Sequence, residues 1–264
     1  METEYPLEIL WRHLQDVPYF RAILRSVEAC FVRRLALPEP MLDVGSGDGH
    51  FASVAFDRPV AVGLDPSPVM VREARRRLVY RLAVCADAVA MPFADRSFAS
   101  VISNSVLEHI ADVEGALREI ARVIQPKGRF VFCVPNHRFA RLLLGSRVLS
   151  SLRMRAASEW YGRLFNRISR HVHCDSPSVW RERLERVGFE VERQWDYFSA
   201  RALATMEIGH AVCLPCLVTR KLTGRWILVR NRVNLLPAYW MVRRHFGEPL
   251  PDEGAYSFYV TRRT

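Results

Sequence analysis

Between residues 41 and 134, short apolar runs alternate with longer stretches in which apolar residues recur at helical spacing. The apolar runs are nearly continuous, as expected of strands that are covered on both faces. Alternation of strands and helices at this spacing predicts a doubly wound α/β fold with a parallel sheet. The expected strands are 41–45, 59–64, 82–86, 98–103 and 128–134, and the expected helices are 49–56, 67–79 and 112–124.

The segments outside this core follow other patterns. Residues 7–37 carry apolar side chains at helical spacing, which predicts one or two helices that end before Pro38. Residues 136–174 alternate arginines with apolar residues, as an amphipathic helix with a basic face does. A capped helix from Asp175 to Gly188 is expected next. The last two strands are expected at 189–195 and 255–260, on either side of a mostly apolar insertion at about 199–250.

These patterns divide the chain into four parts. They are an N-terminal helical segment (1–40), a core (41–135), a basic helical insertion (136–175), and the end of the core sheet with its apolar insertion (176–264). A length of 264 residues suits one large α/β domain with a helical cap. We expect 136–174 and 199–250 to form that cap over the carboxyl ends of the strands, where ligands of such sheets bind.

Composition narrows the setting of the protein. No signal peptide is visible at residues 1–6, and no apolar run reaches the length of a membrane span. The six cysteines are scattered, several of them within apolar runs, which is typical of reduced thiols in a cytoplasmic protein. The apolar insertion with its flanking arginines could instead lie on the inner face of a membrane or line a lipophilic pocket.

Charge is divided unevenly along the chain. Residues 1–135 carry 16 basic and 17 acidic side chains, whereas residues 136–264 carry 22 basic and 11 acidic ones. The basic excess therefore lies entirely in the second half, and nearly all of it is arginine. Arginine suits phosphate and carboxylate groups, although a solvated basic surface explains the bias equally well.

A glycine-rich turn follows the first expected strand, in the stretch Asp43-Val44-Gly45-Ser46-Gly47. Glycines allow a tight turn and a close approach of backbone to ligand, and the following helix turns free N–H groups toward the turn. A dinucleotide fingerprint requires a third glycine at position 50, where this chain has His50. Asp43 would attract the ammonium of an amino-acid moiety and repel a pyrophosphate. The pattern therefore favours S-adenosylmethionine over NAD.

The turn and the motifs that follow it resemble the class I S-adenosylmethionine-dependent methyltransferases, in particular the small-molecule, methyltransferase type 11-like group. Residues 95–102 (DRSFASVI) resemble the family's entry to its fourth strand, and residues 103–110 (SNSVLEHI) resemble its S-x-x-x-L-E-H-I/V signature. The resemblance covers residues 41–134. It implies a Rossmann-like, seven-stranded, mostly parallel sheet with an antiparallel last strand, and S-adenosylmethionine as cofactor.

The cofactor contacts follow partly from position and partly from this resemblance. Asp65 ends the second expected strand 20 residues after Gly45, where a carboxylate can accept both ribose hydroxyls; helix capping is the alternative. The resemblance places adenine at the third strand's end and the methionine moiety at the fourth strand's end. The predicted cofactor residues are Asp43, Gly45, Ser46, Gly47, Asp65, Pro66, Asp87, Ala88, Ser103 and Asn104.

No catalytic residue stands out in the sequence. A general base is needed only for some nucleophiles, and no third ligand accompanies the histidines of the His171-Val172-His173 cluster, so no metal site is predicted. The candidate bases are His109, His137, His171 and His173, with Tyr161 and Tyr197.

The sequence thus predicts a methyltransferase that acts on a small or lipid-like, anionic or apolar acceptor. One alternative is an RNA or protein methyltransferase, which the basic second half favours. The fourth strand lacks the N/D-P-P-Y/F motif of base methylation, and we see no appended RNA-binding module, so nucleic acid is disfavoured as a partner. A second alternative is a non-catalytic protein that only binds the cofactor.

Overall fold

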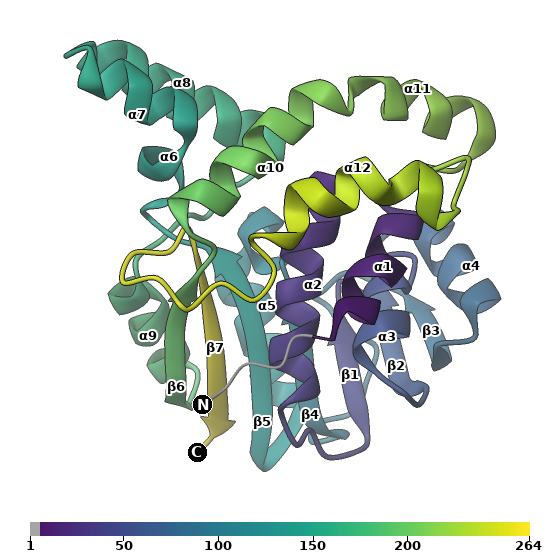
Figure 1. The fold of residues 1–264 in the computed structure, drawn as a ribbon. Helices are drawn as coiled ribbons and strands as arrows, with labels where there is room; N and C mark the ends of the chain where they lie inside the picture. Colours follow the sequence, from purple (N-terminus) through teal and green to yellow (C-terminus); the bar gives the residue numbers. More distant parts are fainter. Residues whose placement is uncertain (1–5) are drawn as a thin grey trace.

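A seven-stranded sheet forms the centre of the computed structural model, which describes residues 6–264 (Figure 1). The strand order is β3-β2-β1-β4-β5-β7-β6, and β7 pairs antiparallel with both of its neighbours. The other strands are parallel to one another, so the predicted mostly parallel sheet with an antiparallel last strand is confirmed. The strands are β1 (Met41–Val44), β2 (Val60–Asp65), β3 (Tyr80–Cys85), β4 (Phe98–Asn104), β5 (Ile124–Pro135), β6 (Phe189–Tyr197) and β7 (Tyr256–Arg263).

Helices cover both faces of this sheet. On one face, α5 (Val113–Val123) and α9 (Pro177–Arg186) pack Leu117 and Trp180 against the β4–β5–β7 region. On the other face lie α3 (His50–Ala55), α4 (Pro68–Arg77) and the N-terminal helices α1 (Leu7–Asp16) and α2 (Tyr19–Arg33). The short 3-10 helix η1 (Leu107–His109) follows β4.

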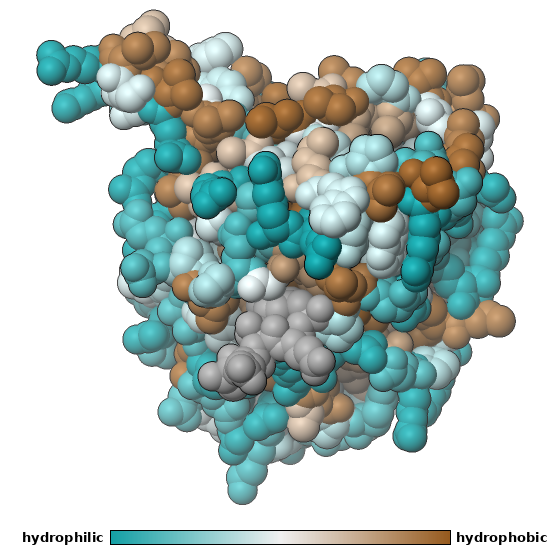
Figure 2. All heavy atoms as spheres, viewed as in Figure 1, coloured by the Kyte–Doolittle hydropathy of each residue, from teal (hydrophilic) through white to brown (hydrophobic). Residues whose placement is uncertain are grey.

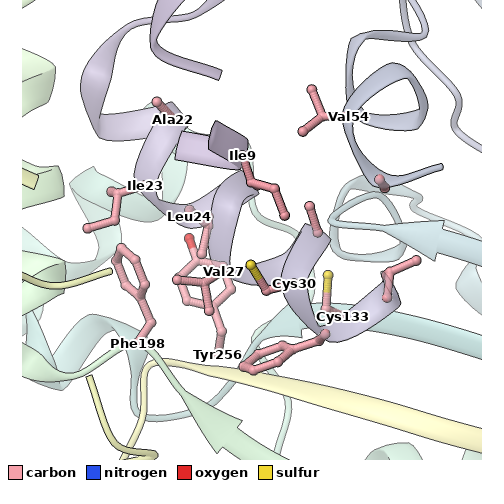
Figure 3. Close-up of a cluster of buried hydrophobic side chains, with 14 of the residues drawn as sticks. Ile9, Ala22, Ile23, Leu24, Val27, Cys30, Val54, Cys133, Phe198 and Tyr256 are labelled. Atoms are coloured by element: carbon pink, nitrogen blue, oxygen red, sulfur yellow. The ribbon is translucent and has the colours of Figure 1, made fainter. Parts of the chain in front are cut away.

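The N-terminal segment forms two helices, separated at Val17 and Pro18. Helix α2 packs along the sheet. It carries apolar residues on nearly all of its sides, and most of its residues are buried. Figure 3 shows Val27 and Cys30 of α2 close to Cys133 of β5 and Tyr256 of β7. This helix is therefore part of the core, and its position decides which side chains reach the end of β4.

Both insertions start where a parallel strand ends. Helices α6 (Phe139–Leu142), α7 (Leu144–Ser151) and α8 (Arg155–Ser169) follow β5, whereas α10 (Ala200–Val212), α11 (Leu214–Thr223) and α12 (Arg232–Arg243) follow β6. Figure 1 shows all six at the end of the sheet toward which β1 and β4 run. They therefore lie at the carboxyl edge, the position expected of a cap.

Several element boundaries differ from the sequence prediction, three of them for a clear reason. Strand β3 starts at Tyr80, two residues early, because Tyr80 pairs with Val60. Strand β5 starts at Ile124 rather than 128, because Ile124 pairs with Phe98 ahead of a register shift. The helix expected to reach residue 124 ends at Val123 for the same reason.

Candidate active site

The predicted cofactor residues lie at the carboxyl ends of β1, β2, β3 and β4. In the strand order, β2 and β3 lie on one side of β1 and β4 lies on the other, so the chain direction across the sheet reverses at β1. Ligands of doubly wound sheets bind at this switch point. The glycine turn after β1 lies there, beside Asp65 of β2.

The glycine turn is closed on one side and open on the other. Gly45, Gly47 and Gly49 all have positive φ angles of 54–78°, a region that L side chains rarely adopt. The amide of Gly45 donates to Leu64 O, and a Cβ at Gly45 would lie 2.4 Å from the Val106 side chain. A Cβ at Gly47 would meet nothing within 4 Å. A ligand can therefore approach the backbone at Gly47, and the turn fits a nucleoside cofactor.

Asp43 lies buried beneath the turn. Its Oδ2 accepts a 2.6 Å hydrogen bond from the Tyr80 hydroxyl. The aromatic ring of Tyr80 packs on Gly63, where any side chain would collide with it. Burial raises the pKa of Asp43 to about 6, against the opposing effect of this hydrogen bond. A cationic ligand group nearby would favour the ionised carboxylate, which fits the ammonium of the predicted cofactor.

Asp65 links the second strand to the glycine turn. Its Oδ2 accepts from the Gly47 amide and its Oδ1 from the Ser67 amide, both at 2.9 Å. The hydroxyl of Ser67 caps α4 by accepting from Met70, so helix capping does not depend on Asp65. The carboxylate retains acceptor capacity toward a ribose, and that role stays a prediction.

The remaining predicted contacts lie at the ends of β3 and β4. Asp87 is exposed just after β3, and its Oδ1 accepts from the amide of Val89. Ala88 beside it is buried. Ser103 and Asn104 end β4 and are buried. Their assignment to adenine and to the methionine moiety stays a prediction.

Sequence reasoning missed a carboxylate that organises the end of β4. Glu28 of α2 is fully buried and accepts from the Asn104 amide (2.8 Å), the Ser105 hydroxyl (2.9 Å) and the Tyr197 hydroxyl (2.8 Å). Arg25, one turn earlier, donates to Glu28 and to Asn104 O at 3.1 and 3.0 Å. The only signal in the sequence was a charged pair at i and i+3 within an apolar helix.

Two of the four candidate histidines come together at the cap side of this site. The rings of His109 and His171 stack with centroids 5.7 Å apart, and Phe139 of α6 lies against His171. Burial lowers the pKa of His109 and lowers that of His171 to about 3, so both imidazoles are neutral at pH 7. His210 of α10, which sequence reasoning did not propose as a base, lies close enough to lower the pKa of His171 further.

The other candidate bases have different surroundings. His173 lies 3.1 Å from Ile110 O and 3.4 Å from Asp175, and His137 interacts with Arg138. The hydroxyls of Tyr161 and Tyr197 donate to Glu207 and Glu28. Among the residues that the structure describes, no group of three His, Cys, Asp or Glu side chains could hold a metal ion.

Glu108 lies directly behind His109. It is buried, its Oε1 is 3.7 Å from His109 Nε2, and its Oε2 has no hydrogen-bond partner within residues 6–264. Burial raises the pKa of Glu108 to about 8. The Glu108 carbonyl accepts from the amides of Val172 and His173, which ties the loop after α8 to η1.

Arginines give this side of the site a positive potential. Arg21, Arg25 and Arg170 each add to the effect of burial in lowering the pKa of His109. Burial also lowers the pKa of Arg21 to about 10, and Arg25 and Arg220 contribute. An anionic group on a ligand would therefore be attracted here.

The comparisons with known proteins agree with this geometry. Residues 42–132 match the sequence family described as the methyltransferase domain. Three relatives are similar to part of this chain. A demethylmenaquinone methyltransferase of Tropheryma whipplei is 34% identical over 131 residues, which are 47% of this chain and 51% of the relative. A malonyl-[acyl-carrier protein] O-methyltransferase of Halorhodospira halophila is 36% identical over 36% of this chain and 34% of its own length. A sterol 24-C-methyltransferase of Aspergillus fumigatus is 34% identical over 45% of this chain and 34% of its own length.

Solved structures resemble the whole chain at low identity. An S-adenosylmethionine-dependent methyltransferase from Mesorhizobium loti covers 91% of this chain and 100% of its own, with a TM-score of 0.51 and 17% identity. A [4+2]-cyclase covers 92% of this chain and 82% of its own, with a TM-score of 0.55 and 19% identity. These likenesses establish the Rossmann-like fold. The chain spans about half or less of the length of the three sequence relatives.

Proposed function

Residues 42–132 form a class I S-adenosylmethionine-dependent methyltransferase domain, and from this premise we propose that the protein transfers a methyl group to a small, lipid-like acceptor. The observation that supports this best is the open side of the glycine turn at Gly47, framed by Asp43 and Asp65. The proposal extends beyond the matched core, because the cap segments that would bind the acceptor lie outside it.

The cofactor, when bound, supplies a methyl group made electrophilic by a positively charged sulfur. Asp43 would hold the ammonium, Asp65 the ribose, and residues 87–88 the adenine. Arg25 adds a contact that the sequence did not suggest: its guanidinium lies at Asn104 O, where it would pair with the carboxylate of the methionine moiety. These residues position the cofactor and exclude water.

His109 is the best-placed general base for an acceptor that must lose a proton. Its Nδ1 lies 2.9 Å from Arg170 O, and since a carbonyl only accepts, Nδ1 carries the hydrogen. Nε2 therefore holds the free lone pair. The His109 side chain is 41% exposed, so a ligand can reach it, whereas Glu108 behind it is buried. His109 Nε2 would take the proton as the acceptor attacks the methyl group.

Two features support a lipid-like acceptor with a polar or anionic head. Phe139 and Phe165 of the cap, together with Phe20 of α2, place aromatic rings against His171 and His210. Arg21, Arg25 and Arg170 lie near His109, whose ring stacks on His171. The named relatives include a demethylmenaquinone methyltransferase and a sterol 24-C-methyltransferase, which is consistent with such an acceptor.

The test combines binding with transfer. Calorimetry of the full chain should detect S-adenosylmethionine and S-adenosylhomocysteine binding; the absence of binding to both would overturn the proposal. Enzyme, S-adenosylmethionine labelled in the methyl group, and a total lipid extract should then yield label in the organic phase. Label that appears only with a water-soluble extract would keep the methyltransferase and reject the lipid-like acceptor.

The role of His109 has its own test. His109→Gln should lower kcat about 10²- to 10⁴-fold and remove the acidic limb of the pH–rate profile. His173→Gln is the matched control, because His173 is a nearby histidine that faces Ile110 O and Asp175. Equal losses in the two variants would mean that both act through the loop structure and that neither is the base.

A further inference from the structure

Helix α11 buries none of its residues. Leu214, Leu217, Val218 and Leu222 are exposed. Leu217 and Val218 lie three and four positions after Leu214, and Leu222 lies four after Val218, so they form one stripe on the helix surface. An apolar stripe of this kind on a monomer marks a contact with another molecule.

The stripe belongs to a larger surface, which we call the apolar cap face. Figure 2 shows hydrophobic residues along the upper edge, where Figure 1 places α10 and α11. Its exposed members all fall within residues 208–241, on the end of α10, on α11, in the following loop and on α12. They are Ile208, Val212, Leu214, Leu217, Val218, Leu222, Leu228, Val229, Val233, Leu236, Trp240 and Met241.

The charge of this segment identifies what kind of partner fits. Between Glu207 and Glu248 the sequence has no acidic residue and seven basic ones. Arg230 and Arg232 pair with Asp16 and Glu8 of α1. The other five are Arg220, Lys221, Arg225, Arg243 and Arg244. Two copies of such a face would repel each other, so a second copy is a poor occupant, whereas an anionic surface is a good one.

Tryptophans stand at the boundary between the apolar and basic parts. The guanidinium groups of Arg21 and Arg220 lie over the ring of Trp226, at 5.6 and 4.4 Å from its centroid. Arg243 lies 5.2 Å from the ring of Trp240, which is largely exposed. Indole rings with neighbouring arginines suit the headgroup level of a bilayer, where one side is apolar and the other is wet.

A second group of exposed apolar residues lies at the same end of the molecule. Leu152, Met154, Trp160 and Ile168 belong to the α7–α8 region, and Figure 1 shows α7–α8 and α11 on opposite sides of the carboxyl edge. An extended flat partner could contact both projections at once. A small protein partner would have to bridge them, so the geometry favours a lipid surface.

The protein would lie on this surface rather than cross it. Within residues 6–264 no single helix is long and apolar enough to span a membrane. Helices α10 and α11 pass that test together but are bent by 56°. Ala202, Leu203 and Met206 of α10 are buried in the protein, so α10 cannot leave it for the lipid.

We propose that the apolar cap face docks on a bilayer that contains anionic lipids, with the α11 stripe inserted at headgroup level and the arginines on lipid phosphates. The inference goes beyond methyl transfer and is tested without cofactor or acceptor. The acceptor-binding side of the site would then open at the membrane.

Flotation with vesicles tests the proposal directly. The full chain should bind vesicles of phosphatidylcholine with about one third phosphatidylglycerol at least tenfold more tightly than phosphatidylcholine vesicles alone, and salt should weaken binding. Leu217→Ser with Leu222→Ser should lower this affinity tenfold or more. The control is Leu82→Ser with Leu78→Ser, because these leucines are 53% and 79% exposed outside the cap, against 52% and 78% for Leu217 and Leu222.

The double variant Lys221→Gln with Arg225→Gln measures the contribution of charge. It should lower the affinity for anionic vesicles roughly tenfold and so remove most of the preference for them. Failure of the full chain to bind anionic vesicles at low salt would overturn the proposal, and so would equal losses in the two leucine pairs. A concentration-dependent dimer that Leu217→Ser with Leu222→Ser abolishes, without vesicle binding, would assign the face to a second copy instead.

Discussion

Glu28 in α2 accepts a 2.8 Å hydrogen bond from the side-chain amide of Asn104 at the end of β4. The same carboxylate accepts from Ser105, whose φ angle of +50° is strained for a residue with a side chain, and from Tyr197 at the end of β6. One buried charge therefore joins the N-terminal helix to the two strand ends that border the site. It holds the backbone at Asn104 and Ser105 in a conformation that the local sequence does not favour.

Replacing this carboxylate should destabilise the protein strongly. Glu28→Gln keeps the shape of the side chain but places an amide NH₂ where the carboxylate accepts hydrogen bonds. We therefore expect the free energy of unfolding to fall by about 2–4 kcal/mol. Urea denaturation measures the loss. Glu73→Gln is the control, because Glu73 pairs with Arg76 on the surface and should change stability by about 0.5 kcal/mol or less. A loss as small as that of the control would show that Glu28 does not organise this region.

The open side of the glycine turn leads to a second prediction. Gly47→Ala should weaken S-adenosylmethionine binding at least tenfold, because the new methyl group enters the space where the backbone approaches the cofactor. Gly224→Ala is a matched control for backbone strain: Gly224 ends α11 with a φ of +73° and also has open space at its Cβ position. Both variants should lose about 1–2 kcal/mol of stability.

Calorimetry and urea denaturation separate the two effects. If Gly47→Ala binds the cofactor as well as Gly224→Ala does, the turn is structural and the cofactor lies elsewhere.

These contrasts explain how much the sequence could predict. The glycine turn, the position of Asp65 at the end of the second strand and the seven strands were predictable because turn chemistry and hydrophobic periodicity act over a few residues. Glu28 was not, because its partners Asn104 and Tyr197 are 76 and 169 residues away along the chain. Likewise nothing local distinguishes His109 and His171 from His137; the loop after α8 brings the first two together.

Asp65 leads to a third prediction, because its two proposed roles can be separated. Asp65→Ala should weaken S-adenosylmethionine binding by about 1–3 kcal/mol through lost hydrogen bonds to the ribose and loss of the contact that closes the turn at Gly47. Ser67→Ala removes the α4 cap and should cost about 1 kcal/mol of stability while affinity is kept. Unchanged affinity in Asp65→Ala would contradict the cofactor role.

The last prediction concerns the buried carboxyl group of Glu108. Burial is the main cause that raises the pKa of Glu108, from 4.5 to about 8. The charge of Arg25 lowers this pKa, and the charge of Glu28 raises it. Between these two pH values the folded protein holds a proton that the unfolded chain has released. The free energy of unfolding therefore falls as pH rises from about 4.5 through 8, with a slope of at most about 1.4 kcal/mol per pH unit from this group.

Glu108→Gln should remove this contribution, because the amide is neutral throughout and resembles the protonated acid. We expect the variant to gain stability relative to the native protein as pH rises from 5 to 8, measured by urea denaturation at each pH. Glu73→Gln again serves as the control, since an exposed carboxylate should give a difference that is nearly constant over the same range. A constant difference for Glu108→Gln as well would mean that Glu108 is already ionised in the folded protein near pH 5, which would contradict the raised pKa.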